Sequence, residues 1–363
     1  MLATLNIHHL RNIGAAQVAP LRRHNVICGP NGSGKTSVLE AAHILGTARS
    51  FRSGHAKSII THGETRLVVY GEKAIADAGQ RSIGVQRELH GDITLKVAGE
   101  PTRSVAQLAD ELPLLVLNGD SFDLLTGEPA NRRRLLDWGV FHVEHDQREH
   151  RTRFQRALTQ RNQLLRRDRI DPEELEVWTR DLARQGTAVA EARQRFFDAL
   201  IETLEPITAA LAPDIGAIQL SYRCGWDSSL SYLEALQRGM TSDSEQGFTH
   251  SGPQRADIRV TVDGYSAAET LSRGQQKLLV AAMKLAQGQI LAQRQGDVLY
   301  LIDDLPSELD QERCERICQM LASMGAQTLI TSVEAESVPT DWLGGMDEVQ
   351  VFHVEQGQIS LAA

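Results

Sequence analysis

Residues 29–36 read Gly-Pro-Asn-Gly-Ser-Gly-Lys-Thr, which is a complete G-x4-G-K-[ST] pattern. Residues 24–28 before it have strand character, and residues 33–44 after it carry apolar side chains at helical spacing. In that setting the glycines let backbone N–H groups and a helix N-terminus surround a phosphate. At average composition a chain of this length would contain the pattern by accident on the order of one or two times in a hundred. The stretch therefore predicts a nucleotide-binding loop in an α/β fold.

The chemistry of such a loop gives its residues separate roles. Lys35 is expected to reach the β- and γ-phosphates of ATP, and Thr36 to supply an oxygen to Mg²⁺. The candidate nucleotide ligands in this part of the chain are Gly29, Asn31, Gly32, Ser33, Gly34, Lys35, Thr36 and Ser37.

A second candidate element is an apolar run over residues 298–302 that ends at two acids, Asp303 and Asp304. A buried strand would deliver Asp303 beside the nucleotide, where its carboxylate can hold Mg²⁺ through water. Asp304 can then align or deprotonate the attacking water. The alternative is that the two acids simply begin a solvated loop. The presence of a phosphate-binding loop elsewhere in the chain makes this alternative weaker. The predicted catalytic residues are Lys35, Asp303 and Asp304, and the predicted Mg²⁺ ligands are Thr36 and Asp303.

Residues 271–277, Leu-Ser-Arg-Gly-Gln-Gln-Lys, lead into a run of helical spacing. Helix capping alone would explain a serine at this place. The pattern Leu-Ser-x-Gly-Gln, however, resembles the signature of the ATP-binding cassette superfamily, which binds the γ-phosphate held by the opposite subunit. The resemblance makes Ser272, Gly274 and Gln275 candidate ATP ligands. Residues 307–310, Ser-Glu-Leu-Asp, are similar to the D-loop of the same superfamily.

Over essentially its whole length the chain is similar to the RecF family, which is related to the heads of Rad50 and the chromosome-maintenance ATPases. The matching segments are residues 10–12, 32–40, 48–52, 131–139, 251–253, 270–277, 300–304 and 307–310. The resemblance implies an ATP-driven homodimer that recognises gapped DNA and works with RecR and RecO to load the RecA recombinase. It also implies nucleotide contacts for Arg11 and Asn12, with a purely structural Arg11 as the alternative.

The expected fold class is α/β, an ATPase head of the ATP-binding cassette type with a mixed sheet, an antiparallel meander and an inserted all-helical arm. The meander is expected over residues 67–72, 82–88 and 92–98, and further strands over 114–117, 218–222, 258–262, 298–302 and 328–331. Residues 129–211 have the composition of two main long helices, with Pro172 and Pro206 expected at helix boundaries. Gly46 is expected to cap the helix after the phosphate loop. The head is thus expected over 1–128 and 212–363 and the arm over 129–211, or as far as about 240.

Two departures from the cassette pattern predict slow hydrolysis. Transporters of that superfamily usually place a glutamate after the magnesium aspartate and a histidine after the next strand, where this chain has Asp304 and Thr331-Ser332. The shorter Asp304 should hold the attacking water less well, so that ATP acts chiefly as a dimerisation switch. Asn118 lies near the place of the glutamine that senses magnesium in that superfamily.

The charge distribution suggests where DNA binds. The 363-residue chain carries a formal charge of −9, yet residues 131–170 contain eleven arginines and five acids, a local balance of +6. Arg132, Arg133 and Arg134 are the first candidates, because neighbouring residues on a helix point in different directions and cannot all pair along one face. For the segment as a whole a solvated, ion-paired surface is an equal alternative. Arg49 and Arg52 are candidates either for DNA contact or for bridging the two lobes.

The remaining polar residues suggest no further chemistry. The four cysteines are scattered, and Cys314 and Cys318 at i, i+4 are expected in the core of a helix face. His142, His145 and His150 lack the H-E-x-x-H spacing of a zinc helix. No run approaches the roughly 18 apolar residues of a membrane span, and residues 1–10 do not look like a signal peptide, so a cytosolic location is expected.

Two other functions are kept as alternatives. A P-loop ATPase of the Rad50 class coupled to a nuclease would cut DNA in the presence of Mg²⁺. The ATPase subunit of a transporter would hydrolyse ATP rapidly and associate with membranes.

Overall fold

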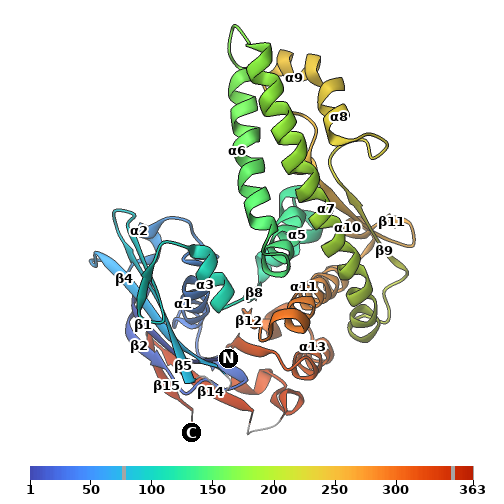
Figure 1. Ribbon diagram of the computed structural model, residues 1–363. Helices are drawn as coiled ribbons and strands as arrows, with labels where there is room; N and C mark the ends of the chain where they lie inside the picture. The colour runs from blue at the N-terminus through green and yellow to red at the C-terminus, as the bar shows by residue number, and fades with distance from the viewer. Residues whose placement is uncertain (76–78, 345–347, 363) are drawn as a thin grey trace. The chain divides into compact units, whose positions relative to one another are not determined.

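The computed structural model describes residues 1–75, 79–344 and 348–362. The chain forms two compact units, unit 1 over Met1–Ser121 with Gln295–Ala363 and unit 2 over Phe122–Arg294 (Figure 1). Unit 2 includes the helical segment 129–211 that the sequence predicts as an arm. It also includes residues 212–294, with the segment that resembles the cassette signature, so it is larger than the predicted arm.

A mostly parallel sheet carries the phosphate loop in unit 1. Its strands in spatial order are β15 (Gln358–Leu361), β14 (Val349–Glu355), β3 (His24–Cys28), β13 (Gln327–Ser332), β12 (Leu299–Ile302) and β8 (Leu114–Leu117). Only the edge strand β15 runs antiparallel to its neighbour. Buried strands of this kind have apolar side chains on both faces, which explains the unbroken apolar runs of β8 and β12. The predicted strands 114–117, 298–302 and 328–331 are confirmed.

An antiparallel sheet forms the second layer of unit 1. Its strands are β2 (Ile13–Val18), β1 (Leu2–Leu10), β4 (Arg66–Ile75), β5 (Gly79–Glu88), β6 (Ile93–Val97) and β7 (Glu100–Thr102). The predicted meander is therefore confirmed in β4, β5 and β6. Helix α1 (Lys35–Thr47) packs on strands of both sheets, and in Figure 1 it lies with α3 (Val105–Glu111) beside them. The main hydrophobic core of unit 1 gathers side chains from α1 and both sheets.

Helix α1 ends later than expected, and the expectation for Gly46 is wrong. Gly46 lies inside the helix, while Ala48 forms the C-cap in the left-handed conformation with φ 54°. A Cβ atom on Gly46 would come within 2.7 Å of Leu114 Cδ2 and 2.8 Å of the Leu112 carbonyl oxygen. The glycine is therefore needed for the close approach of helix and sheet.

The other α-helices of unit 1 are the short α2 (Ala56–Ile59) and α12 (Leu305–Glu308) and the longer α13 (Gln311–Ser323). Cys314 and Cys318 are buried on α13 and both are free thiols, as the sequence predicts. Burial raises the pKa of Cys314 to about 11 and that of Cys318 to about 12, which keeps both thiols protonated and unreactive.

Unit 2 combines helices with a small sheet. Its helices are α4 (Asp123–Thr126), α5 (Pro129–Val143), α6 (Gln147–Leu165), α7 (Pro172–Leu211), α8 (Tyr232–Arg238), α9 (Met240–Gln246), α10 (Ala267–Thr270) and α11 (Arg273–Gln295). The strands β9 (Ile218–Arg223), β10 (Asp257–Val262) and β11 (Tyr265–Ser266) form an antiparallel sheet in the order β11-β10-β9. The predicted strands 218–222 and 258–262 are confirmed.

The prediction for the two prolines is half right. Pro172 begins α7, where Asp171 caps the helix by accepting from the N–H groups of Glu173 and Glu174. Pro206, by contrast, lies inside α7, which continues to Leu211. Pro206 is exposed to solvent, where water can hydrogen-bond the carbonyl group that loses its N–H partner. The segment 129–211, in which two main helices are expected, contains the three helices α5, α6 and α7.

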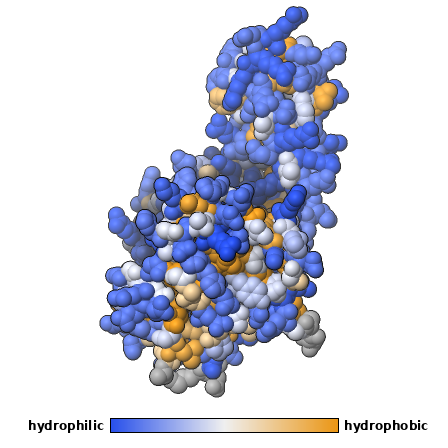
Figure 2. All heavy atoms as spheres, turned by 90° about the vertical axis from the view of Figure 1, so that its left-hand side faces the viewer, coloured by the Kyte–Doolittle hydropathy of each residue, from blue (hydrophilic) through white to orange (hydrophobic). Residues whose placement is uncertain are grey.

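The distribution of hydrophilic residues and the character of the helices bear on whether the chain contains a membrane-spanning segment. At the top of Figure 2, where the turn between α6 and α7 lies, hydrophilic residues predominate. In the part of the chain that the structure describes, no helix has the length and apolar character needed to cross a lipid bilayer.

Candidate nucleotide-binding site

The phosphate loop follows β3 and is held in place by neighbouring strands. The N–H of Gly29 donates to the carbonyl of Val333 at 3.1 Å. Gly29 has φ 147°, and a Cβ atom there would lie 2.1 Å from the carbonyl oxygen of Val354. Gly34 has φ 122°, immediately before the first residue of α1. The sequence pattern thus has glycine where crowding or backbone conformation excludes other residues.

Two side chains of the loop fit a bound phosphate. The Lys35 ammonium group donates to the carbonyl oxygens of Gly29 at 2.7 Å and Pro30 at 3.0 Å, so it is held at the loop. The hydroxyl of Ser33 is buried and has no hydrogen-bond partner among the described residues. A buried hydroxyl without a partner requires an explanation, and a phosphate oxygen would provide one. These groups, with the N-terminus of α1, fit the triphosphate of ATP.

Asn12 braces the loop from outside. Its side-chain Nδ2 donates to the carbonyl oxygens of Gly32 at 3.2 Å and Ser33 at 2.9 Å, and its Oδ1 accepts from the Ser37 hydroxyl at 3.2 Å. Asn12 and Ser37 therefore support each other and the loop backbone. Direct nucleotide contacts of Asn12, Ser37, Asn31 and Gly32 stay a prediction; of these residues Asn12, Asn31 and Gly32 are exposed.

The predicted magnesium ligands meet in the structure. Thr36 Oγ1 donates to Asp303 Oδ1 at 3.0 Å, and Thr331 Oγ1 donates to the same oxygen at 2.8 Å. The Thr331 hydroxyl also accepts from the N–H of Asp304 at 2.8 Å. A carboxylate beside a hydroxyl at the phosphate loop is the donor set that P-loop proteins use for Mg²⁺. Thr331 connects both acids, a role the sequence analysis did not assign because it depends on the parallel pairing of β12 with β13.

Asp304 occupies an unusual backbone position. Its φ of 56° and ψ of 47° are left-handed, a conformation that aspartate and asparagine tolerate better than most residues. This geometry turns the chain directly after Asp303. Its role with the attacking water stays a prediction.

Asn118 lies at the same edge of the sheet. It follows β8, which pairs in parallel with β12, and the N–H of Asp303 donates to the carbonyl of Leu117 at 2.8 Å. The Asn118 side-chain oxygen accepts from the hydroxyl of Ser121 at 2.9 Å. Asn118 therefore directly follows the residue whose carbonyl accepts from the N–H of Asp303, and a magnesium-sensing role for its side chain stays a prediction.

Arg11 forms a polar cluster with a residue that the sequence analysis missed. Its guanidinium donates to both carboxylate oxygens of Glu40, at 2.9 and 2.8 Å, and Glu40 is completely buried in α1. Glu40 also accepts a short hydrogen bond from the Ser50 hydroxyl, which in turn accepts from the N–H of Arg52 at 2.9 Å. Arg11 thus connects α1 with the segment that carries Arg49 and Arg52. Its contact with a nucleotide stays a prediction.

Arg49 and Arg52 are both exposed. The carbonyl oxygen of Arg49 lies 2.6 Å from His43 Nδ1 and accepts from the Thr47 hydroxyl at 3.1 Å. The backbone of this segment is therefore fixed to α1 while the guanidinium groups lie at the surface. Both proposed roles, DNA contact and lobe bridging, stay open.

The segment that resembles the cassette signature begins α11 in unit 2. The hydroxyl and N–H of Ser272 donate to Gln275 Oε1 at 3.0 and 3.1 Å, and the Ser272 hydroxyl accepts from the N–H of Gln275 at 3.4 Å. This reciprocal cap explains the local structure. Ser272 itself is exposed, and Gly274 and Gln275 are half-buried. Asp310, in the D-loop-like segment of unit 1, caps α13 by accepting from the N–H of Arg313 at 3.0 Å.

The three arginines proposed for DNA differ in their surroundings. Arg132 donates to Asp257 at 2.7 and 3.3 Å, and Arg133 donates to the carbonyl of Ala256 at 3.0 Å. Burial, followed by the nearby charge of Arg193, lowers the pKa of Arg133. Arg134 is exposed and donates to Asn131 at 2.9 Å. DNA contact by these three residues stays a prediction, and the geometry makes Arg134 the most accessible of them.

The basic excess of residues 131–170 is partly compensated within unit 2. Ion pairs join arginines of this segment to acids outside it, as in Arg132–Asp257, Arg161–Asp243 and Arg167–Glu174. Of these pairs Arg167–Glu174 lies at the surface, whereas Arg161–Asp243 is buried, so only part of the compensation is of the solvated kind.

The histidines near these arginines make other contacts. His142 is buried against the rings of Trp138 and Phe141, and His150 Nδ1 lies 2.7 Å from Gln185 Oε1. Among residues 1–75, 79–344 and 348–362, no group of three or more His, Cys, Asp or Glu side chains is placed to hold a metal ion.

The chain matches known proteins over almost its whole length. Residues 1–360 match the family described as RecF/RecN/SMC N terminal domain. The chain is 41% identical over 360 residues to the DNA replication and repair protein RecF of Pseudomonas aeruginosa, which covers 99% of this chain and 97% of that protein. It is 42% identical over 364 residues to the RecF protein of Cellvibrio japonicus, covering all of both chains.

Solved structures show the same fold. A structure of the recombination mediator protein RecF with ATP, described as part of the RecFOR pathway, superimposes with a TM-score of 0.88 at 22% identity, covering 100% of this chain and 97% of that chain. The Smc head domain of Pyrococcus furiosus superimposes with a TM-score of 0.60 at 15% identity, covering 99% of this chain and 95% of that chain. From its sequence relatives and its match over residues 1–360, the chain belongs to the RecF family of DNA replication and repair proteins.

Proposed function

We propose that two copies of this chain bind two ATP molecules with Mg²⁺ between them and that the resulting homodimer holds DNA. The phosphate loop in unit 1 would bind each nucleotide, with Lys35 at the phosphates and Thr36 and Asp303 at the metal. Ser272, Gly274 and Gln275 of the neighbouring copy would meet the γ-phosphate. The observation that carries this proposal is the exposure of Ser272 at the start of α11, where the helix N-terminus favours an anion.

The DNA that this dimer recognises is proposed to contain single-stranded gaps next to duplex. The proposal rests on the family, whose members are DNA replication and repair proteins, and on solved relatives described as recombination mediators of a RecFOR pathway. In that pathway the dimer would act with RecR and RecO to promote loading of RecA. The location would be the cytoplasm.

ATP hydrolysis is proposed to be slow and to serve as a switch. Asp304 follows the magnesium aspartate where a longer glutamate is usual in transporters, so the attacking water would be held less firmly. A dimer stable while ATP is intact and open after hydrolysis would release DNA in a controlled way.

The test combines sedimentation with DNA binding by the full-length chain. ATP with Mg²⁺ should shift the sedimentation coefficient from monomer to dimer, and the dimer should bind a gapped duplex more tightly than the monomer does. Affinity should fall steeply with salt, because counterions are released when arginines neutralise phosphates. Equal binding with and without ATP would refute the switch, and Mg²⁺-dependent cutting of the DNA would favour the nuclease-coupled alternative.

A further inference from the structure

One face of the small sheet in unit 2 is polar and carries two arginines from different strands. Arg223 on β9 lies opposite Asp257 on β10, and Arg259 on β10 lies opposite Ser221 on β9. Side chains alternate along a strand, so these four residues share one face of the sheet. Arg223 and Arg259 are both exposed. As diagonal neighbours they stand about 7–8 Å apart at the backbone, within reach of one anion or of two adjacent ones.

Internal pairing leaves these two arginines free. Asp257, the acid on this face, is held by a bidentate pair with Arg132, whose Nε and Nη2 donate to it at 2.7 and 3.3 Å. Arg132 is only 12% exposed. Neither Arg223 nor Arg259 makes an ion pair with any residue in the part of the chain that the structure describes. Arg132 therefore neutralises Asp257 and leaves two uncompensated guanidinium groups beside it.

Two adjoining hollows open on these groups. The first, of about 360 Å³, is lined by Arg132, Arg223, Asp257 and Arg259 among others. The second, of about 600 Å³, shares Arg223 and Asp257 and adds Arg255. Together the linings contain four arginines and one aspartate, a balance of +3 in a chain whose formal charge is −9. The two hollows thus form one electropositive surface, here called the arginine face, with Arg223, Arg255 and Arg259 as its exposed cations.

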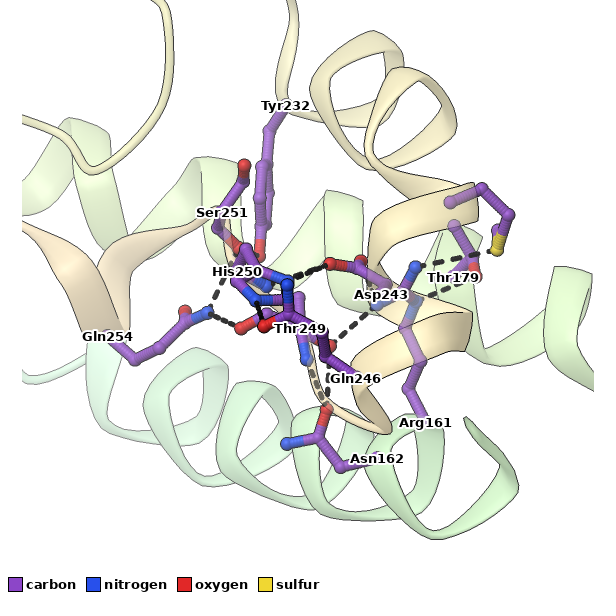
Figure 3. A network of polar contacts seen from close by, with 11 residues as sticks. Arg161, Asn162, Thr179, Tyr232, Asp243, Gln246, Thr249, His250, Ser251 and Gln254 are labelled. Atoms are coloured by element: carbon purple, nitrogen blue, oxygen red, sulfur yellow. Dashed lines mark hydrogen bonds and ion pairs between the residues drawn. The ribbon is translucent and has the colours of Figure 1, made fainter. Parts of the chain in front are cut away.

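A buried polar network holds the segment that presents Arg255. Arg161 is completely buried, and its Nη1 donates to Asp243 at 2.8 Å and to the Thr249 hydroxyl at 2.6 Å (Figure 3). Asp243 also accepts from the N–H of His250 at 3.0 Å, which fixes the backbone after Thr249. A buried charge pair with satisfied partners holds its segments in one arrangement, because breaking it would leave a buried charge. The network thereby fixes the chain just before Arg255.

We infer that the arginine face is a phosphate-backbone site for DNA, deepening the proposed function on which it rests. Guanidinium groups bind phosphate with two N–H donors at once, and neighbouring hydroxyl groups such as that of Ser221 can add hydrogen bonds. The second hollow also contains the half-buried rings of Tyr222 and Trp226, so the preference for a phosphodiester chain rests on the three exposed guanidinium groups of the face. Backbone contacts of this kind orient DNA without reading its sequence.

The test uses the full-length chain with Arg223→Ala and Arg259→Ala combined, and a fluorescein-labelled gapped duplex in the presence of ATP and Mg²⁺. Loss of two phosphate contacts should lower the affinity about tenfold or more near 0.1 M salt. The slope of log K against log salt concentration should become shallower by about 2, one for each lost contact. Replacing both residues with lysine should keep most of the slope, because lysine retains the charge.

The matched control removes two other exposed arginines of unit 2, Arg180 and Arg238, which lie outside residues 131–170, and it changes the net charge equally. It should keep the affinity and slope of the unchanged chain. ATP-driven sedimentation and circular dichroism should be unaltered in the alanine pair, which would exclude misfolding.

The outcomes separate this inference from the proposed function. If the unchanged chain binds DNA and the alanine pair binds it equally well, the arginine face is not a DNA site although the proposed function stands. If the alanine pair loses binding to polyglutamate but not to DNA, the face serves an acidic protein and the inference is overturned. If the unchanged chain does not bind DNA at all, both proposals fail.

Discussion

The hydroxyl of Thr36 donates a 3.0 Å hydrogen bond to the carboxylate of Asp303, although 267 residues separate them in the chain. The contact joins the start of α1 to the end of β12, as expected if both residues belong to one magnesium site. It also brings a hydroxyl and a carboxylate together at the phosphate loop, which is the arrangement that a magnesium ion needs.

Replacing Asp303 with asparagine should remove most of the Mg²⁺ dependence of ATP binding. The amide keeps the size of the side chain but lacks the negative charge that attracts the metal. Titration with a fluorescent ATP analogue should then give similar affinities with Mg²⁺ and with EDTA, whereas the unchanged chain should prefer Mg²⁺ by about tenfold or more. Asp310→Asn, an exposed helix-cap acid, is the control, and an unaltered Mg²⁺ preference in Asp303→Asn would contradict the assignment.

Substitutions of Asp304 test the proposal that ATP hydrolysis is slow and serves as a switch. Asp304→Asn should prevent hydrolysis while the ATP-bound dimer persists, because asparagine tolerates the left-handed backbone but cannot act as a base. Asp304→Glu should raise the single-turnover rate several-fold, at a cost of about 1–2 kcal/mol in stability from the backbone conformation. Quenched-flow measurement with radiolabelled ATP distinguishes these cases. Hydrolysis by Asp304→Asn at the original rate would assign the base to another residue.

Ser272→Arg should leave ATP binding intact and block dimerisation. Ser272 is exposed at the start of α11, so a bulky cation there should not disturb the fold but should obstruct a neighbouring nucleotide. Lys35→Met, in contrast, should lose both ATP binding and the dimer. Sedimentation velocity with ATP measures both variants, and an ATP-dependent dimer of Ser272→Arg would contradict the shared site.

Gly46→Ala should destabilise the chain by about 1–3 kcal/mol through overpacking. The added methyl group would lie 2.8 Å from the Leu112 carbonyl oxygen, a backbone atom that cannot move aside easily. Gly14→Ala is the matched control, because nothing lies within 4 Å of the Cβ atom it would add. Urea unfolding monitored by circular dichroism should show the difference, and equal midpoints for the two variants would count against tight packing at Gly46.

Stability should fall in mild acid because of His24. Burial and, secondarily, the charge of Arg23 lower the pKa of His24 to about 4, from an ordinary value near 6.5. The unfolded chain therefore binds the proton more readily, so the contribution of neutral His24 is complete above about pH 6.5 and is lost as the pH falls towards 4. The apparent melting temperature of the unchanged chain should drop more over this window than that of His24→Gln. Parallel curves for the two proteins would rule out His24 as the cause.

Local patterns in the sequence were enough to predict much of the fold and part of the site. The strand at residues 24–28, the strand at 114–117 and the meander follow from apolar spacing and turn residues, which act within a few positions. The phosphate loop was predictable because its residues are contiguous in the sequence and because Gly29 and Gly34 have positive φ angles that favour glycine. Pro172 at the start of α7 follows the same logic, since proline suits the first turn of a helix.

Features that depend on tertiary neighbours could not be predicted in this way. Glu40 is an ordinary helical acid in the sequence, and only the approach of Arg11 gives it a partner. Arg223 and Arg259 are isolated in sequence, so no basic run announces them, and the register of β9 with β10 alone brings them together. The prediction for Pro206 was wrong because the sequence does not show that this part of α7 is exposed, where water can bond the carbonyl group that loses its N–H partner.

The bracing of the phosphate loop has a consequence for the order in which the protein is made. The loop is translated early, yet the N–H of Gly29 is bound by Val333, and the Ser33 carbonyl accepts from the N–H of Gly357 at 2.8 Å. A growing chain on the ribosome therefore lacks these two contacts until Val333 and Gly357 have emerged, and until then its loop relies on the brace from Asn12. Copies that stop before Gly357 lack one of these contacts, so on the proposed function they should bind ATP more weakly than copies that contain it.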